Sequence, residues 1–152
     1  MATATVTNAG VNLLRDSMRG VLSNTQILYV AVGTGSTAPA ATDTQLQTEV
    51  FRKALTSSAN GAAAGEGIFT LYLSPQDVVG TAIAEVGWFA GSSASGTANS
   101  GVLVARALYS HTKQAQNQSI LRLTSPSRRR RHAVQPDNVG QWNHARQRPE
   151  YE

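Results

Sequence analysis

The segment Gln26–Val32, with the sequence QILYVAV, decides the fold class. It is a nearly continuous run of apolar, β-forming residues, and Gly33 ends it. A run of this length that is apolar at odd and even positions alike is typical of a strand covered on both faces. We therefore expect a sheet with a layer of protein on each side.

Two later segments show the alternation of strands in which one face is buried. In Ile68–Leu73 (IFTLYL), every second residue is large and apolar. In Thr81–Phe89 (TAIAEVGWF), one face is apolar and the opposite face carries Glu85. The predicted core residues of these two segments are Phe69, Leu71, Leu73, Ala82, Ala84, Val86 and Trp88.

Three more strands are predicted at Glu49–Ser57, Val102–Tyr109 and Ser119–Thr124. No helical period separates the strands, and short turns or small-residue loops join them. One of these loops, Gly91–Gly101, is rich in Ser, Ala, Gly and Thr, and we expect a mobile loop or a surface insertion there. The pattern predicts an all-β fold, with an antiparallel β-sandwich or jelly-roll-like body over residues 1–124.

One short helix is expected near the N-terminus, at about residues 7–20. Asn8 is the predicted N-cap, and Gly20 suits a left-handed exit. Val11, Leu14 and Met18 would form an apolar stripe that docks on the body or on a neighbouring subunit. A single helical turn is also predicted at residues 42–48, capped by Thr42 or Asp43.

The sequence changes character at Ser125. Residues 125–152 carry six arginines against three acidic residues, whereas residues 1–124 have a net charge of only +1. This segment predicts a basic, extended C-terminal arm, unless a shift of reading frame produced it. Its candidate partner-docking residues are Arg128, Arg129, Arg130, Arg131, Trp142, Arg146 and Arg148. Arginine runs bind carboxylates of proteins or phosphates of nucleic acid, and we expect the former.

Composition narrows the function classes. The chain has no cysteine, and only 14% of its residues are charged. Such a neutral surface is easy to bury against a partner protein. No apolar run reaches the length of a membrane span, and the N-terminus lacks the pattern of a secretion signal. We therefore expect the protein to be made and assembled in the cytoplasm, without a membrane partner.

The sequence suggests no catalytic, cofactor-binding or metal-binding residues. Gly33-x-Gly35 lacks the third glycine and the helix of a nucleotide site. His111, His132 and His144 lack metal-ligand spacing. Glu85 interrupts an apolar strand, and we expect it to form a structural ion pair with Arg52 or Arg106 rather than to act as a catalytic acid.

Four segments together resemble a family of small virion proteins of tailed bacteriophages, usually labelled tail-fibre or tail structural proteins. They are TNAGVNLLRD (Thr7–Asp16), YVAVGTGSTAPAATDTQLQTEVFRKALTS (Tyr29–Ser57), IAEVGWFAG (Ile83–Gly91) and GVLVARALYSHTKQ (Gly101–Gln114). The resemblance implies a non-enzymatic particle component, most simply of the tail or tail-fibre apparatus. Residues 125–152 depart from the family pattern.

Several partners and roles stay open. A virion subunit would associate with itself, as a trimer or hexamer, and with tail, baseplate or major capsid proteins. The first alternative is a capsid decoration (cement) protein that grips the shell through its arm. The second is a receptor- or carbohydrate-binding module with Trp88, Phe89 and Tyr109 as a sugar platform, although we expect Trp88 in the core. The third is a nucleic-acid binder that uses the arginine run.

Overall fold

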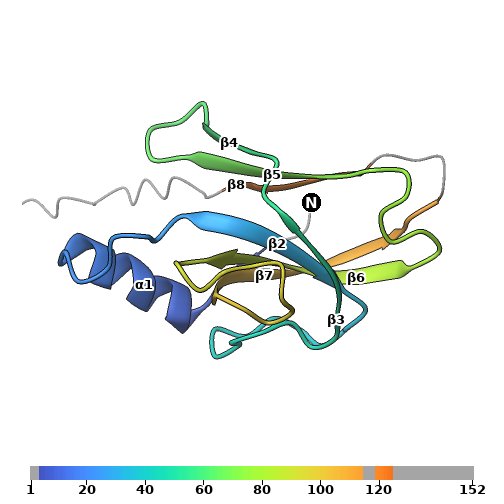
Figure 1. The fold of residues 1–152 in the computed structure, drawn as a ribbon, viewed down its shortest axis with the longest axis horizontal. Helices are drawn as coiled ribbons and strands as arrows, with labels where there is room; N and C mark the ends of the chain where they lie inside the picture. The colour runs from blue at the N-terminus through green and yellow to red at the C-terminus, as the bar shows by residue number, and fades with distance from the viewer. Residues whose placement is uncertain (1–3, 115–118, 125–152) are drawn as a thin grey trace, which may run out of the picture.

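In a computed structural model, the chain is mostly β, as predicted, with one short helix (Figure 1). The structure describes residues 4–114 and 119–124. Every strand pairing in these ranges is antiparallel. The elements are β1 (Thr5–Val6), α1 (Asn8–Met18), β2 (Ile27–Gly33), β3 (Glu49–Ala54), β4 (Ser57–Asn60), β5 (Gly67–Leu73), β6 (Ala82–Ala90), β7 (Val102–Thr112) and β8 (Ser119–Thr124).

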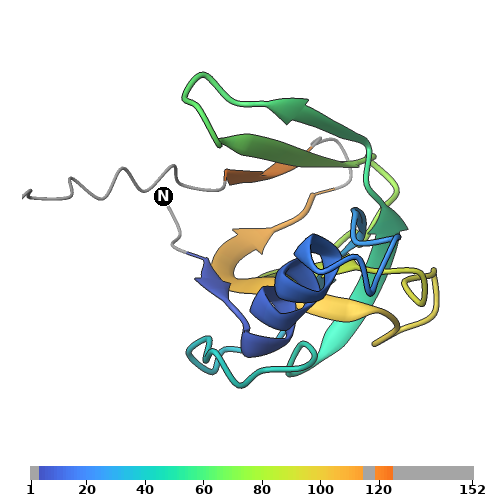
Figure 2. The same cartoon turned by 90° about the vertical axis from the view of Figure 1, so that its left-hand side faces the viewer.

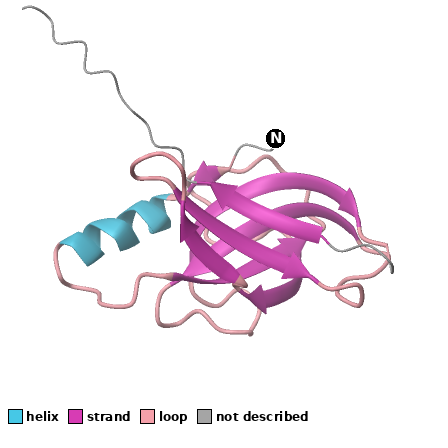
Figure 3. Cartoon of the chain, turned by 90° about the horizontal axis from the view of Figure 1, so that it is seen from above, coloured by secondary structure: helices cyan, strands magenta, loops and turns pink. Residues whose placement is uncertain are grey.

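The strands form two sheets that face each other (Figures 1 and 3). The large sheet has the order β1-β7-β6-β2-β3, and the small sheet has the order β4-β5-β8. The single strand predicted at Glu49–Ser57 is in fact divided between the sheets. β3 ends at Ala54, and the chain then crosses to β4 through Leu55 and Thr56.

The main core lies between the sheets and contains the predicted residues of β5. It consists of Val30, Val32, Leu71, Leu73, Ile83, Val86, Trp88, Ala105 and Ala107, with Phe69 packed against it. The prediction for β6 is correct for Val86 and Trp88 but wrong for Ala82, which is exposed. A register shift between Ile83 and Glu85 interrupts the alternation, so Ile83 takes the core position instead.

A second cluster covers the outer face of the large sheet. Ala31, Phe89 and Leu103 project from three strands of this sheet and pack with Leu46, which comes from the loop between β2 and β3. Residues Val30–Gly33 of β2 are therefore buried on both faces, as the apolar run predicted. The covering layer is a loop rather than a second sheet, and its attachment forms the candidate site described below.

The helix α1 lies beside β7, and its capping differs from the prediction (Figure 2). Thr7, not Asn8, is the N-cap, and its hydroxyl accepts a hydrogen bond from the Gly10 N–H at 3.0 Å. The same hydroxyl donates to the Leu103 carbonyl, which ties the cap to β7. Gly20 follows the helix with a φ of 71°, as predicted.

The apolar stripe predicted on α1 does not dock on the described part of the body. Gly10 and Leu13 face the sheet, whereas Val11, Leu14 and Met18 are exposed. A Cβ on Gly10 would lie 2.7 Å from the Val104 carbonyl oxygen, so the backbone of α1 sits directly on β7. The pairing of β1 with β7 sets the rotation of α1 just before the helix begins, and this constraint outweighs the periodicity of the helix itself.

Candidate functional site

The Glu85 carboxylate is the centre of a buried polar network. Its Oε1 accepts hydrogen bonds from the N–H groups of Gly35 at 3.1 Å and Thr48 at 2.7 Å. Its Oε2 accepts from the Gln47 N–H at 3.0 Å and from Arg106 Nε at 2.8 Å. An ionised carboxylate offers about four acceptor positions, and these four donors occupy them. Glu85 is fully buried and has no position left for a substrate proton or a metal ion.

Arg106 on β7 extends the network from the sheet into the loop 34–48. Its Nη1 donates to Asp43 Oδ2 at 2.8 Å, and its Nη2 donates to the Thr37 carbonyl at 3.0 Å. The expected Glu85–Arg106 ion pair is thereby confirmed. The helical turn predicted at residues 42–48 is absent. Asp43 instead accepts a hydrogen bond from the Ala40 N–H at 2.9 Å and binds Arg106.

The pKa directions fit a permanently charged network. Burial by itself raises the pKa of Glu85, but the hydrogen bonds from Thr48, Gln47 and Arg106 outweigh it and hold that pKa below its ordinary value. Asp43 shows the same balance, with its pKa lowered by the Ala40 N–H and by Arg106 against the effect of burial. A general acid that works near neutral pH would need the opposite shift.

The position of the Glu85 carboxylate explains why residues 33 and 35 are both glycine. A Cβ on Gly33 or on Gly35 would lie 2.5 Å from Glu85 Oε1, and one on Gly35 would also lie 2.5 Å from Gln47 Cβ. These glycines let the loop backbone approach the carboxylate closely enough to donate to it. The N–H group that a phosphate would need at Gly35 is already bound to Glu85.

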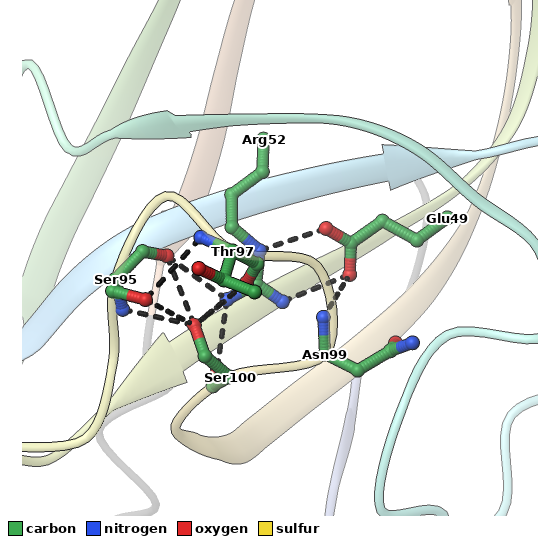
Figure 4. A network of polar contacts seen from close by, with 6 residues as sticks. All are labelled: Glu49, Arg52, Ser95, Thr97, Asn99 and Ser100. Atoms are coloured by element: carbon green, nitrogen blue, oxygen red, sulfur yellow. Dashed lines mark hydrogen bonds and ion pairs between the residues drawn. The ribbon is translucent and has the colours of Figure 1, made fainter.

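A second network fastens the other loop of the large sheet, residues 91–101 (Figure 4). Arg52 on β3 donates to Glu49 through Nε at 2.7 Å and Nη2 at 2.8 Å, and through Nη1 to the Ser100 carbonyl at 2.7 Å. The Asn99 N–H donates to Glu49 Oε2 at 3.1 Å. Arg52 therefore pairs with Glu49, not with Glu85, and the loop expected to be mobile is anchored by these bonds.

The aromatic residues proposed as a sugar platform do not form one. Trp88 is buried between the sheets, and Phe89 is fully buried on the opposite face. The Arg52 guanidinium lies 3.9 Å from the centre of the Phe89 ring, a cation–π contact that covers this ring. Tyr109 is half-buried with its ring 5.9 Å from that of His111. The expectation that Trp88 belongs to the core is confirmed.

A different kind of candidate site is an apolar groove, which we call the α1 groove. It has a volume of about 1210 Å³ and lies between α1 and the β4–β5 hairpin, above the end of the large sheet. Val6, Val11 and Leu14 form the helix side, and the small residues 61–65 form the hairpin side. Its lining also includes Ile27, Phe69, Ala105 and Leu123. Such a groove suits an apolar partner rather than a charged ligand.

Comparisons with known proteins find no family model, no curated protein and no solved structure that matches this chain. Within residues 4–114 and 119–124, no group of three or more metal-ligating side chains is close enough to hold a metal ion. Within the same ranges, no helix has the length and apolar character of a membrane span.

The predicted arm and its docking residues fall outside the described ranges. These residues are Arg128, Arg129, Arg130, Arg131, Trp142, Arg146 and Arg148. His132 and His144 fall outside them too. In the body, the sequence pointed to Glu85 and Arg106 because charges that interrupt apolar strands need partners. It did not identify the backbone donors of the loop, since an N–H group leaves no mark in a sequence.

Proposed function

We propose that this chain is a non-enzymatic structural subunit of a tailed-bacteriophage particle and acts through protein–protein contacts. The observation that carries the proposal is the Glu85 network. It joins the stretch VGTGSTAPAATDTQL to the stretch EVGWF, the two segments on which the family resemblance mainly depends. The residues that make the chain resemble virion proteins thus have a structural task, which is to fix a loop on a sheet.

Both buried arginines serve the same purpose. Arg106 and Arg52 each bind a carboxylate and a loop carbonyl, so each fastens one long loop to the large sheet. A loop fixed before binding loses little conformational entropy when a partner covers it. This arrangement suits a subunit that repeats the same contacts many times in a particle.

The finer architecture and the location belong to the same proposal. We infer that the two facing sheets form an antiparallel β-sandwich with residues 1–124 as the body and residues 125–152 as the arm. We place the subunit in the tail or tail-fibre apparatus, where it would bind copies of itself and tail or baseplate proteins. Capsid decoration, with the arm gripping the major capsid protein, is the alternative location within this function class.

Quantitative mass spectrometry of purified particles tests the proposal. The particles are those of the phage whose genome encodes the chain, banded on a density gradient and washed in high salt to remove adsorbed protein. We expect the chain to remain with the particles at a few copies each. A copy number close to that of the major capsid protein would move the subunit to the capsid. Absence from washed particles, with the chain free in the lysate, would overturn the proposal.

A further inference from the structure

The outward side of α1 carries an unusual concentration of exposed apolar residues. The exposed fractions of Val11, Leu14 and Met18 are 55%, 62% and 81%. Together with the exposed residues Val6, Val21 and Leu22, they form what we call the α1 ridge. Single exposed apolar residues are normal on protein surfaces, but a contiguous set marks an interaction site. Nothing in the described part of the chain covers this ridge.

The ridge runs along the edge of the α1 groove, so a protrusion and a hollow lie side by side. Val6, Val11 and Leu14 belong to both features. A surface with an apolar ridge next to an apolar groove is complementary to its own copy after rotation by a two-fold axis.

We propose that two copies of this chain associate through this surface, with α1 of each copy lying in the α1 groove of the other. The inference rests on the proposed function, and it identifies a second copy of the chain as the partner of the α1 ridge and the α1 groove. The dimensions of α1 and of the α1 groove agree with this arrangement. α1 has 11 residues, which corresponds to a cylinder about 16 Å long and about 10 Å wide, or about 1,300 Å³. The groove has a volume of about 1210 Å³, enough to receive the outward half of such a helix, whose other face lies on β7.

The charges also agree with a second copy as the occupant. At the C-terminal end of α1, Asp16 Oδ1 lies 2.9 Å from one nitrogen of Arg15 and 3.5 Å from one of the C-cap residue Arg19, so this end, with its cap, has a net charge of +1. The charged residue among the described lining of the groove is Glu66 on the hairpin side. The capped end of α1 and the groove thus carry single charges of opposite sign, and the rest of the groove lining is mainly apolar.

The area suits a reversible contact. Half of the helix surface plus the facing groove wall amounts to on the order of 600 Å² per partner, from the dimensions of an α-helix. Specific interfaces begin at about 1,200 Å² in total, so the pair lies at the lower limit of stable association. A two-fold contact of this kind gives a dimer, or a hexamer that contains two-fold axes, but not a lone trimer.

Sedimentation velocity on the full chain, from about 1 to about 100 µM, tests the inference over the range expected for a small interface. The variants are Leu14→Lys on the ridge and Val79→Lys as a matched control, because Val79 is also exposed, at 46%, but lies outside the ridge and the groove lining. We expect the unchanged chain and Val79→Lys to dimerise alike. Leu14→Lys should raise the dissociation constant about tenfold or more, since a charge would enter an apolar contact. Circular dichroism of both variants should match that of the unchanged chain.

Two results would overturn the inference. One is a full chain that stays monomeric over the whole range, which would also follow if residues 125–152 filled the groove. The other is equal dimerisation of Leu14→Lys and Val79→Lys, which would place the contact elsewhere. Neither result bears on the proposed function: a monomer that is nevertheless found in washed particles refutes the dimer alone, and a dimer absent from particles refutes the virion role alone.

Discussion

Two regions on the large sheet differ in whether their side chains find partners within the described chain. One is formed by the loops 34–48 and 91–101, and the other by α1 and its groove. Under the loops 34–48 and 91–101, each carboxylate and guanidinium has its partners within the described chain. At α1, by contrast, apolar side chains face water next to an apolar groove. The first region is closed by its own residues, whereas no described residue covers the second. On the proposal above, the polar networks maintain the shape of the chain and the apolar surface binds a partner.

The loop region should therefore be sensitive to mutation and inert in binding, and the helix region should show the reverse. Breaking a buried ion pair costs much folding stability, because removal of one partner leaves the other charge buried without a counter-charge or water. An exposed apolar side chain contributes little to folding, because it is equally hydrated in the unfolded chain. Four predictions test this contrast, beginning with the largest effect on stability.

Glu85→Ala should destabilise the chain most. The substitution leaves Arg106 buried with one carboxylate partner fewer, and it removes the acceptor of the Gly35, Gln47 and Thr48 N–H groups. We expect a loss of about 3–5 kcal/mol in the free energy of unfolding, measured by urea denaturation.

The matched control is Glu66→Ala, in a hairpin loop where the carboxylate accepts a hydrogen bond from the exposed Ala63 N–H at 3.0 Å. It should cost less than about 1 kcal/mol. Equal losses for the two variants would mean that the Glu85 network contributes nothing special to stability.

Gly35→Ala should destabilise the chain by about 1–3 kcal/mol, the usual cost of forcing a methyl group into a packed site. Its Cβ would lie 2.5 Å from Gln47 Cβ and from Glu85 Oε1. Gly96→Ala is the control, because a Cβ there would meet nothing within 4 Å. Thermal unfolding should show a lower midpoint for Gly35→Ala and no decrease for Gly96→Ala. A tolerated Gly35→Ala would contradict the tight approach of the loop to the carboxylate.

The free energy of unfolding should decrease as the pH is lowered in the acid range. The pKa values of Glu85 and Asp43 are lowered in the folded chain, so the unfolded chain binds more protons as the pH falls. Their contribution is complete above the ordinary carboxyl pKa of about 4 and is lost as the pH drops through the lower folded values. Glu85→Gln should show a shallower dependence of unfolding free energy on pH between about 5 and 2. An unchanged slope would show that Glu85 does not titrate in this way.

The smallest effect on stability is expected on the α1 ridge. Leu14→Ala should change the unfolding free energy of the monomer by no more than about 0.5 kcal/mol, because this side chain is 62% exposed. Its neighbour Leu13 is only 8% exposed, so Leu13→Ala should cost at least about 2 kcal/mol. Urea denaturation below the dimerisation range compares the two. A reversed order would mean that the helix presents its other face to the sheet.

Local patterns in the sequence predicted part of this fold. The run QILYVAV identified β2, which is buried on both faces from Val30 onward, and the alternation in IFTLYL identified the core residues Phe69, Leu71 and Leu73. The sequence offered Arg52 or Arg106 as the partner of Glu85 because each interrupts an apolar strand, and the structure pairs Glu85 with Arg106. These inferences succeeded because burial leaves a regular trace along a strand.

Long-range constraints account for the errors. The rotation of α1 depends on β1 and Thr7 binding β7, which lies about a hundred positions away in sequence, so the apolar stripe does not dock on the described part of the body. The anchoring of the loop 91–101 depends on Arg52, far away on β3. Its Ser/Ala/Gly composition, considered alone, suggested mobility. The register shift beside Ile83 likewise depends on the pairing of β6 with β7.

Hydrogen–deuterium exchange at two protein concentrations, about 1 and about 100 µM, tests the contrast between the two regions most directly. The account predicts that peptides containing Gly35, Gln47 and Thr48 are protected equally at both concentrations, because their N–H groups donate to Glu85 within one chain. It predicts that peptides covering α1 gain protection only at the higher concentration. Rapid exchange at the loop amides, together with α1 exchange that is the same at both concentrations, would contradict the account.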